Sequence, residues 1–161
     1  AKSLNIELQK ALNSSAMGKV ERFGITFVTG DKVMQVQNNY DKEVFNGDIG
    51  VIWEISQGKM VVRYPDWDAT YEAGQMDEIT LAYAMSVHKS QGSEYSVVVL
   101  PLTVGHSVML QRNLLYTAVT RAKERVILVG SPRALQIAVQ SDRTRKRYSL
   151  LAERLREVEF I

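Results

Sequence analysis

Residues 86–95 read SVHKSQGSEY and lie between two apolar segments. Residues 81–85, LAYAM, precede this stretch, and residues 96–100, SVVVL, follow it. Short apolar runs bounded by polar residues are typical of buried strands, so we expect a strand over each of these two segments. The polar residues between them then form a loop on a rigid scaffold, which is a common location for binding chemistry.

The chain after this loop alternates between helical and strand patterns. We expect a helix over 109–121, a strand over 125–129 and a last helix over 143–158. Ser131 and Pro132 are favoured residues at the cap and first position of a helix, so another helix should begin there. Apolar strands that alternate with helices predict an α/β fold with a parallel sheet covered on both faces.

The chain before the loop begins with a helical pattern. Over residues 2–13 the side chains of Leu4, Leu8, Ala11 and Leu12 recur on one helical face. Strand patterns follow over 23–28 and 32–37. Apart from Ser3, no residue before this helical pattern is a typical helix-start signal, so we expect the chain to be part of a longer protein.

Residues 38–80 have a different texture, with short strands and frequent turns. Asn46 and Gly47 predict a tight turn, and Ser56-Gln57-Gly58-Lys59 predicts a hairpin. Val51, Trp53 and Ile55 alternate with Ile52, Glu54 and Ser56, the pattern of a half-buried strand, and we expect Trp53 on its inner side. We therefore expect a small SH3-like β-barrel over 38–80, inserted into a larger domain made of 1–37 and 81–161.

The composition excludes several classes of protein. The 161 residues are 45% hydrophobic and 24% charged, with a net charge of +2, which permits a nucleic-acid partner without requiring one. Cysteine is absent and there are two histidines, so we expect neither disulfides nor a metal site. No secretory signal or membrane-length apolar run is present in these residues, and we expect a cytoplasmic protein with no membrane partner.

A second polar stretch, residues 116–125, reads YTAVTRAKER. Thr117 and Arg121 are four residues apart and would share one helical face. A guanidinium at the end of a helix and the edge of a sheet can bind a phosphate with two hydrogen bonds. The alternative is that Arg121 only stabilises the helix C-terminus by its charge.

Both polar stretches resemble helicase motifs. Residues 82–95, AYAMSVHKSQGSEY, resemble motif V of superfamily 1 helicases, and residues 114–130, LLYTAVTRAKERVILVG, resemble motif VI. Their form is that of the RecD-like group, which includes stand-alone RecD-like DNA helicases and the alpha chain of exodeoxyribonuclease V. The resemblance extends to other segments across the chain, with the sequences LNIELQKALN, GDKVMQVQNNY, EVFNGDIG and RTRKRYSLLAERL.

The resemblance implies a fold and an activity. The chain would be the second RecA-like motor domain, of the P-loop NTPase type, interrupted by an SH3-like insert. The whole protein would use ATP and Mg²⁺ to move 5′ to 3′ along single-stranded DNA and unwind duplex junctions, in DNA repair and recombination. Its partners would be an N-terminal RecA-like domain of the same protein and, in one branch of the group, exonuclease V-type subunits.

The resemblance also implies four residues at the nucleotide. Arg121 matches the motif VI arginine that reaches the γ-phosphate of ATP held by the other RecA-like domain, where it stabilises transition-state charge. Glu94 matches the motif V acid that contacts the ribose, although an unengaged surface acid is the alternative. Gln91 and Gly92 match positions that line the nucleotide cleft.

Residues at the DNA are implied in the same way. Ser86 and His88 match positions that face the DNA backbone, and both side chains can donate hydrogen bonds to phosphate. Asn38 and Asn39, with Tyr40, lie at the start of the expected insert, where they either contact DNA or fix the domain junction.

One motif of an ATPase is absent from these residues. No G-x-x-x-x-G-K-[ST] sequence occurs in the chain, so it has no P-loop lysine. We therefore expect half of an ATP site, with ATP and Mg²⁺ held mainly by an N-terminal domain, and no hydrolysis by these residues alone. The alternative function is a helicase-like subunit that acts only within an exodeoxyribonuclease V-type complex.

Overall fold

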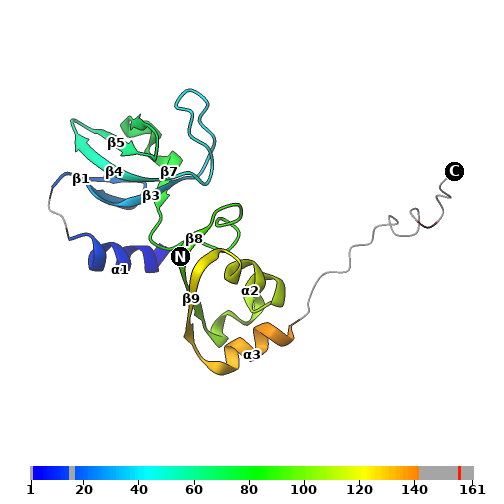
Figure 1. The fold of residues 1–161 in the computed structure, drawn as a ribbon. Helices are drawn as coiled ribbons and strands as arrows, with labels where there is room; N and C mark the ends of the chain where they lie inside the picture. Colours follow the sequence, from blue (N-terminus) through cyan, green and yellow to red (C-terminus); the bar gives the residue numbers. More distant parts are fainter. Residues whose placement is uncertain (1, 15–16, 142–155, 157–161) are drawn as a thin grey trace. The chain divides into compact units, whose positions relative to one another are not determined.

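A computed structural model of the chain describes residues 2–14, 17–141 and 156 (Figure 1). The chain divides into two compact units, residues 1–91 and residues 92–161. The expected helix over 143–158 lies outside the described residues apart from Arg156.

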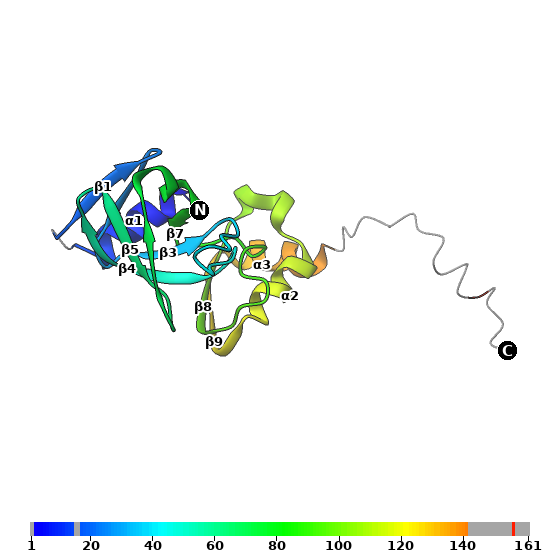
Figure 2. The ribbon, with the colours of Figure 1, turned by 90° about the horizontal axis from the view of Figure 1, so that it is seen from above.

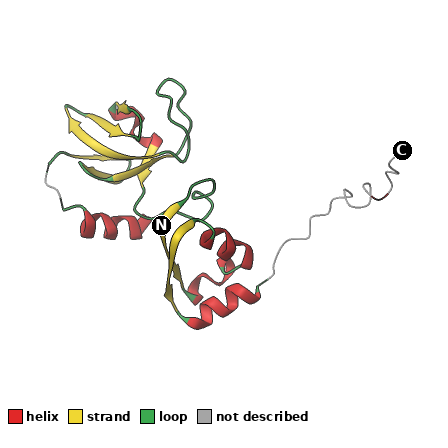
Figure 3. Ribbon diagram, in the orientation of Figure 1, coloured by secondary structure: helices red, strands yellow, loops and turns green. Residues whose placement is uncertain are grey.

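The first unit is built on antiparallel β structure (Figure 3). Helix α1 (Lys2–Leu12) is followed by a hairpin of β1 (Lys19–Arg22) and β2 (Ile25–Val28). A five-stranded sheet has the order β6-β5-β4-β3-β7. Its strands are β3 (Lys32–Gln35), β4 (Ile49–Ser56), β5 (Lys59–Arg63), β6 (Asp68–Tyr71) and β7 (Ile79–Leu81), and the 3₁₀ helix η1 (Ala73–Glu78) joins the last two.

This sheet is larger than the expected insert. Strands β3 and β7 lie on either side of residues 38–80 in the sequence, yet they pair with each other, and β3 pairs with β4. The expected boundaries at 37/38 and 80/81 therefore pass through one hydrogen-bonded sheet. The fold class, an α/β motor fold with an SH3 element, agrees with the structure, whereas the assignment of residues 1–37 to the motor domain stays a prediction.

A single apolar core fills the first unit. It combines residues of the hairpin, the sheet and η1, including Phe27, Val33, Ile52, Met60, Val62, Tyr71, Met76 and Ile79, each at most 2% exposed. Gly50 lies against this core, because an added Cβ would come within 2.6 Å of the Val62 side chain. The core also holds polar atoms that satisfy one another: the Tyr71 hydroxyl donates to Gln35 Oε1 at 2.8 Å and lies 2.8 Å from the Tyr64 hydroxyl.

The prediction for Trp53 was wrong. Its neighbour Ile52 points into the core, whereas Trp53 is 57% exposed. Val51, two residues earlier, is also 43% exposed, so alternation itself places Trp53 on the outer face. The register shift between Ile52 and Glu54 then turns Ile55 toward the core. The Arg63 guanidinium covers the Trp53 ring, 3.6 Å from its centroid, and the Asp68 carboxylate holds Arg63 through two hydrogen bonds of 3.0 Å.

Helix α1 packs in a way that its apolar pattern did not predict. Asn5 and Gln9 are its buried residues, whereas Leu4 and Leu12 are 43% and 70% exposed. Figure 2 shows α1 alongside the strands of its unit. The helix therefore docks on this unit through a polar stripe.

The second unit has a parallel pair of strands with helices on one side (Figure 1). Strands β8 (Tyr95–Leu102) and β9 (Ala122–Gly130) are parallel, as expected from the sequence. The segments between and after them form η2 (Val104–Met109), α2 (Arg112–Val119) and α3 (Pro132–Gln140). Ser131 caps α3, since its hydroxyl accepts a hydrogen bond from the Ala134 amide at 3.2 Å.

One face of this parallel pair is covered. Leu100 and Leu102 of β8 pack with residues of α3 and with Leu110. The alternate residues Val97 and Val99 are 46% and 59% exposed, so the described residues leave the other face of β8 largely uncovered. Helix α2 also ends two residues earlier than expected, which leaves Arg121 beyond the helix.

Candidate functional site

The loop that the sequence singled out is a compact turn at its start. The amides of Lys89 and Ser90 donate to Ser86 O at 3.0 and 3.2 Å, and the Ser90 hydroxyl donates to Val87 O at 2.8 Å. Ser90 is consequently 8% exposed, whereas the side chains of Ser86 and His88 are exposed. The turn therefore presents a hydroxyl and an imidazole to solvent.

The loop residues from Gly92 onward belong to the second unit. Gly92 has φ of 85°, a left-handed conformation that glycine adopts without strain. Glu94 Oε2 forms an ion pair with Lys123 Nζ at 3.2 Å, and both side chains are more than half exposed. Gln91, at the end of the first unit, is exposed.

Arg121 is fixed by two hydrogen bonds to the segment before β8. Its Nη1 donates to Ser93 O at 3.2 Å, and the Tyr95 amide donates to Arg121 O at 2.8 Å. The structure therefore brings Arg121 next to the segment that contains Gly92 and Glu94. Thr117, by contrast, turns its hydroxyl back to Asn113 O at 2.9 Å.

The guanidinium of Arg121 retains an unsatisfied donor. Its Nε is buried and has no hydrogen-bond partner among the described residues. A buried donor without a partner is costly, and a guanidinium prefers planar oxygen-rich anions such as phosphate. The resemblance to motif VI assigns a phosphate to Arg121, and this role stays a prediction.

A second polar loop, residues 38–48, joins β3 to β4 in the first unit. Asn38 Oδ1 accepts from the Asn46 amide at 2.9 Å, and Asn39 accepts from the Lys42 amide at 3.1 Å and donates to Glu78 Oε2 at 2.8 Å. Both asparagines therefore hold the loop in shape. Their contact with DNA stays a prediction.

This loop also brings Tyr40 together with Phe45, a residue that the sequence did not single out. Tyr40 is 75% exposed and meets the ring of Phe45 edge-on, with centroids 5.9 Å apart. The Lys42 ammonium lies over the buried Tyr71 ring, 4.8 Å from its centroid, without a hydrogen-bond partner among the described residues. The sequence signal that could have predicted this exposed aromatic pair is the close spacing of Tyr40 and Phe45 within a turn-rich loop.

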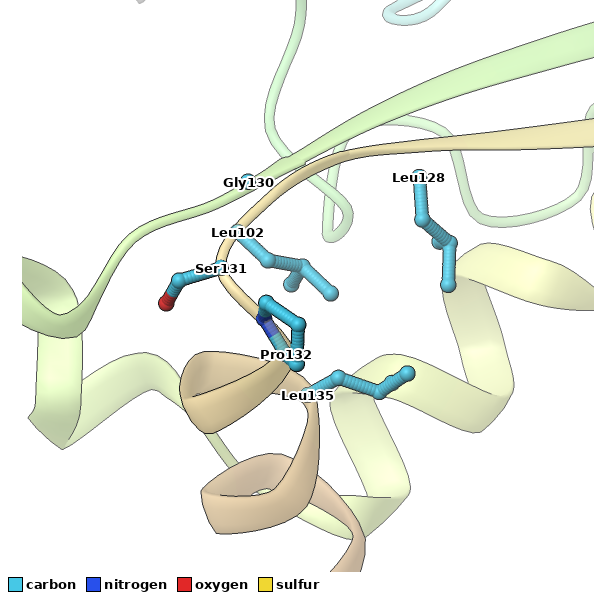
Figure 4. Close-up of a pocket in the computed structure, with 6 residues that line it drawn as sticks. All are labelled: Leu102, Leu128, Gly130, Ser131, Pro132 and Leu135. Atoms are coloured by element: carbon cyan, nitrogen blue, oxygen red, sulfur yellow. The ribbon is translucent and has the colours of Figure 1, made fainter.

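The pocket in the second unit is apolar and contains none of the predicted site residues (Figure 4). It has a volume of about 200 Å³ and is lined by Leu102, Leu128, Gly130, Ser131, Pro132 and Leu135. Its one polar side chain, Ser131, already caps α3. Within the described part of the chain, no group of acidic or histidine side chains is suited to hold a metal ion, and no helix is long and apolar enough to cross a membrane.

Two family models match the chain in succession. Residues 4–64 match the SH3 domain of ATP-dependent RecD-like DNA helicases, and residues 81–129 match the UvrD-like helicase C-terminal domain. The first match begins before the expected insert and includes β3, in agreement with the sheet described above.

Curated relatives point in the same direction. The chain is 38% identical over 127 residues to the ATP-dependent RecD2 DNA helicase of Deinococcus radiodurans, a match that covers 79% of this chain and 18% of that protein. It is 36% identical over 121 residues to the RecBCD enzyme subunit RecD of Mycolicibacterium smegmatis, covering 74% of this chain and 21% of the subunit. The chain thus spans about a fifth of the length of these relatives.

Solved structures support the fold. The structure matches Pif1 helicase from Bacteroides in complex with ADP-AlF3 and single-stranded DNA, with a TM-score of 0.62, 17% identity, and coverage of 97% of this chain and 42% of that one. A structure of two coordinating Pif1 helicases at forked duplex DNA matches with a TM-score of 0.61 and 19% identity, over 98% of this chain and 42% of that one. At these identities the matches establish the fold alone.

Proposed function

Because the chain belongs to the RecD-like DNA helicases of superfamily 1, we propose that it is the C-terminal motor part of an ATP-dependent 5′–3′ DNA helicase. In this proposal residues 1–37 and 81–161 belong to the second motor domain, and the SH3-like insert, residues 38–80, shares one sheet with β3 and β7 at the junction. The ATP site is shared with an N-terminal domain that holds most of the nucleotide and its Mg²⁺.

The observation that carries the proposal is the unpartnered Nε of Arg121. The hydrogen bond to Ser93 O uses Nη1, so the guanidinium is oriented by a contact within its own unit. A cation held in place before the reaction stabilises charge on a transferring phosphoryl group without the cost of reorganisation. In other nucleotide hydrolases such an arginine contributes about 10³- to 10⁵-fold in rate, which corresponds to roughly 4–7 kcal/mol.

The neighbouring residues complete the nucleotide side of the proposed site. Gly92 permits close backbone approach, Gln91 lines the cleft and Glu94 binds the ribose hydroxyls. The Glu94–Lys123 pair is exposed on both sides, and such pairs contribute little to stability. Glu94 can therefore give up its ion pair with Lys123 and bind a ribose instead at a small energetic cost.

The exposed part of the first unit supplies the DNA contacts in this proposal. Ser86 and His88 donate to the phosphate backbone from the turn of residues 86–91. Asn38 and Asn39 shape the loop that presents Tyr40, whose exposed ring is suited to stacking on a base. Uncharged donors bind phosphate less tightly than lysine would, which favours release at each translocation step.

Similarity to the RecD subunit of RecBCD enzyme supports a second candidate, in which the helicase works only inside an exodeoxyribonuclease V-type complex. The two candidates differ in what the purified full-length protein does alone. A stand-alone helicase unwinds a duplex with a 5′ single-stranded tail, whereas a complex-dependent subunit does so only with its partners.

The experiment that tests the shared ATP site compares this 161-residue chain with the full-length protein. We expect DNA-stimulated ATP hydrolysis from the full-length protein and none above background from the chain, because the chain has no P-loop lysine. Hydrolysis by the isolated chain would contradict the half-site proposal. Unwinding of 3′-tailed but not 5′-tailed duplexes would contradict the proposed polarity.

A further inference from the structure

The polar stripe of α1 holds the segment that leads into the loop of residues 86–91. Asn5, Gln9 and Asn13 are four residues apart and lie on one face of the helix or at its end. Asn5 and Gln9 are 7% and 8% exposed, which is unusual for amide side chains. Buried amides of this kind specify one geometry, because each must meet a particular partner.

Asp31 is the centre of these contacts. This carboxylate is fully buried, at the turn between β2 and β3. It accepts hydrogen bonds from Asn13 Nδ2 at 2.8 Å, from the Val28 amide at 2.8 Å and from the Gln9 side chain. A fourth donor is the hydroxyl of Tyr83, at 2.9 Å. A buried carboxylate is stable only when its oxygens are satisfied in this way, so the four donors are held together.

Asp31 and Asn5 each contact a residue shortly before the loop. Tyr83 is bound to Asp31 across 52 residues of sequence. The neighbouring Ala84 is held by both of its main-chain atoms: Asn5 Nδ2 donates to Ala84 O at 2.7 Å, and the Ala84 amide donates to Asn5 Oδ1 at 2.8 Å. Side-chain contact with both polar atoms of one residue fixes that residue as a strand neighbour would.

The loop itself has local contacts. The hydrogen bonds of residues 86–91 within the described part of the chain join loop residues to one another. The orientation of Ser86 and His88 is therefore set by where residue 84 is held, two positions before the turn begins.

We propose that Asn5, Asp31 and Tyr83 are positioning residues that set the orientation of the loop of residues 86–91, and through it the binding of single-stranded DNA. The functional half of this inference rests on the proposed function, because it takes Ser86 and His88 as DNA contacts. None of the three touches DNA or nucleotide in the proposal. Each acts through the main chain that leads into the loop.

Conservative variants separate this role from general stability. Tyr83→Phe keeps the ring and removes the hydroxyl that binds Asp31. Asn5→Asp keeps the acceptor for the Ala84 amide and removes the donor to Ala84 O. Glu7→Gln is the matched control, since Glu7 lies on the same helix, is exposed and pairs with Lys10.

The first measurement is amide hydrogen exchange of the 161-residue chain, followed by mass spectrometry of its peptides. We expect exchange in the peptide covering 85–91 to be about tenfold faster in Tyr83→Phe and Asn5→Asp, with unchanged exchange in β4 and β5 and no effect of Glu7→Gln. Unchanged exchange at 85–91 in both variants overturns the inference. Equal acceleration in β4 and β5 overturns it as well, because it indicates a general loss of stability.

The second measurement is the affinity of the full-length protein for an oligothymidylate. We expect Tyr83→Phe to weaken binding severalfold and Glu7→Gln to leave it unchanged. Wild-type affinity in Tyr83→Phe overturns the functional half of the inference. If the wild-type protein itself does not bind the oligonucleotide, the proposed function fails, and the exchange experiment still decides whether these residues position the loop.

Discussion

Arg121 and Ser93 are joined by a hydrogen bond of 3.2 Å between the guanidinium Nη1 and the main-chain oxygen, although 28 residues separate them in sequence. The return contact, from the Tyr95 amide to Arg121 O at 2.8 Å, ties the start of β8 to the residue before β9. Together these bonds fix both the main chain and the side chain of Arg121. Its Nε is left buried and unpartnered among the described residues.

The exposed turn of residues 86–91 predicts a specific effect on DNA binding. Ser86→Ala and His88→Ala should each weaken binding of single-stranded DNA by the full-length protein several-fold, since a hydrogen bond contributes about 0.5–1.5 kcal/mol. Fluorescence anisotropy with a labelled oligonucleotide measures the change. Ser86 is uncharged, so Ser86→Ala should leave the salt dependence of binding unchanged.

Ser56→Ala provides the control for this experiment, because Ser56 is an exposed serine at the end of β4. Its affinity should match the wild type. If Ser86→Ala and His88→Ala also bind as tightly as the wild type, the turn does not contact the DNA backbone.

Removal of the buried hydrogen bond between Tyr71 and Gln35 should lower the stability of the fold. Tyr71→Phe removes the hydroxyl that donates to Gln35 Oε1 and leaves that buried oxygen without this donor. Such a change costs about 1–3 kcal/mol in the free energy of unfolding, which urea denaturation measures. Tyr40→Phe is the control and should shift it by less than about 0.5 kcal/mol, as exposed positions generally do; equal stability of the two variants would refute the role of the buried network.

The neighbouring Tyr64 predicts a dependence on alkaline pH. Burial raises the pKa of its hydroxyl to about 12, with the hydrogen bond to Tyr71 acting in the opposite direction, whereas an unfolded tyrosine has a pKa of about 10. Between these two values the folded state binds more protons than the unfolded state, so the free energy of unfolding falls as the pH rises. The contribution is present in full below about pH 10.

Tyr64→Phe should therefore lose less stability than the wild type between about pH 10 and 12. Urea denaturation at several pH values in this window gives the comparison. Parallel pH profiles for the two proteins would show that the Tyr64 hydroxyl is not protected from ionisation in the folded state.

The parts of the fold with strong local signals were predicted well. Ser131 and Pro132 mark the start of α3 by cap chemistry, and the valine-rich run around Val98 identifies β8, because these signals depend on neighbours in sequence. Trp53 was misplaced because alternation gives two faces without saying which is inner, and the inner face here is that of Ile52. The side chains on α1 were misjudged for a related reason, since periodicity marks an apolar stripe but the partner determines which stripe is buried.

Part of the candidate site could likewise be predicted from the sequence, and part could not. Resemblance to motifs V and VI identified Arg121 and the loop of residues 86–95. The hydrogen bond between Arg121 and Ser93 joins residues 28 positions apart, and the hydrogen bond between Asn5 and Ala84 joins residues 79 positions apart. No local sequence pattern encodes either contact. Such contacts follow from tertiary packing and require the folded structure.

The measurement that tests the central proposal most directly is DNA-stimulated ATP hydrolysis by the full-length protein carrying Arg121→Ala. The proposal predicts a fall of about 10³- to 10⁵-fold, with single-stranded DNA still bound at close to wild-type affinity, and little effect of Arg125→Ala, an exposed arginine of β9. Retained binding shows that the variant is folded. Hydrolysis by Arg121→Ala at a rate near that of the wild type would contradict the assignment of Arg121 to the phosphate.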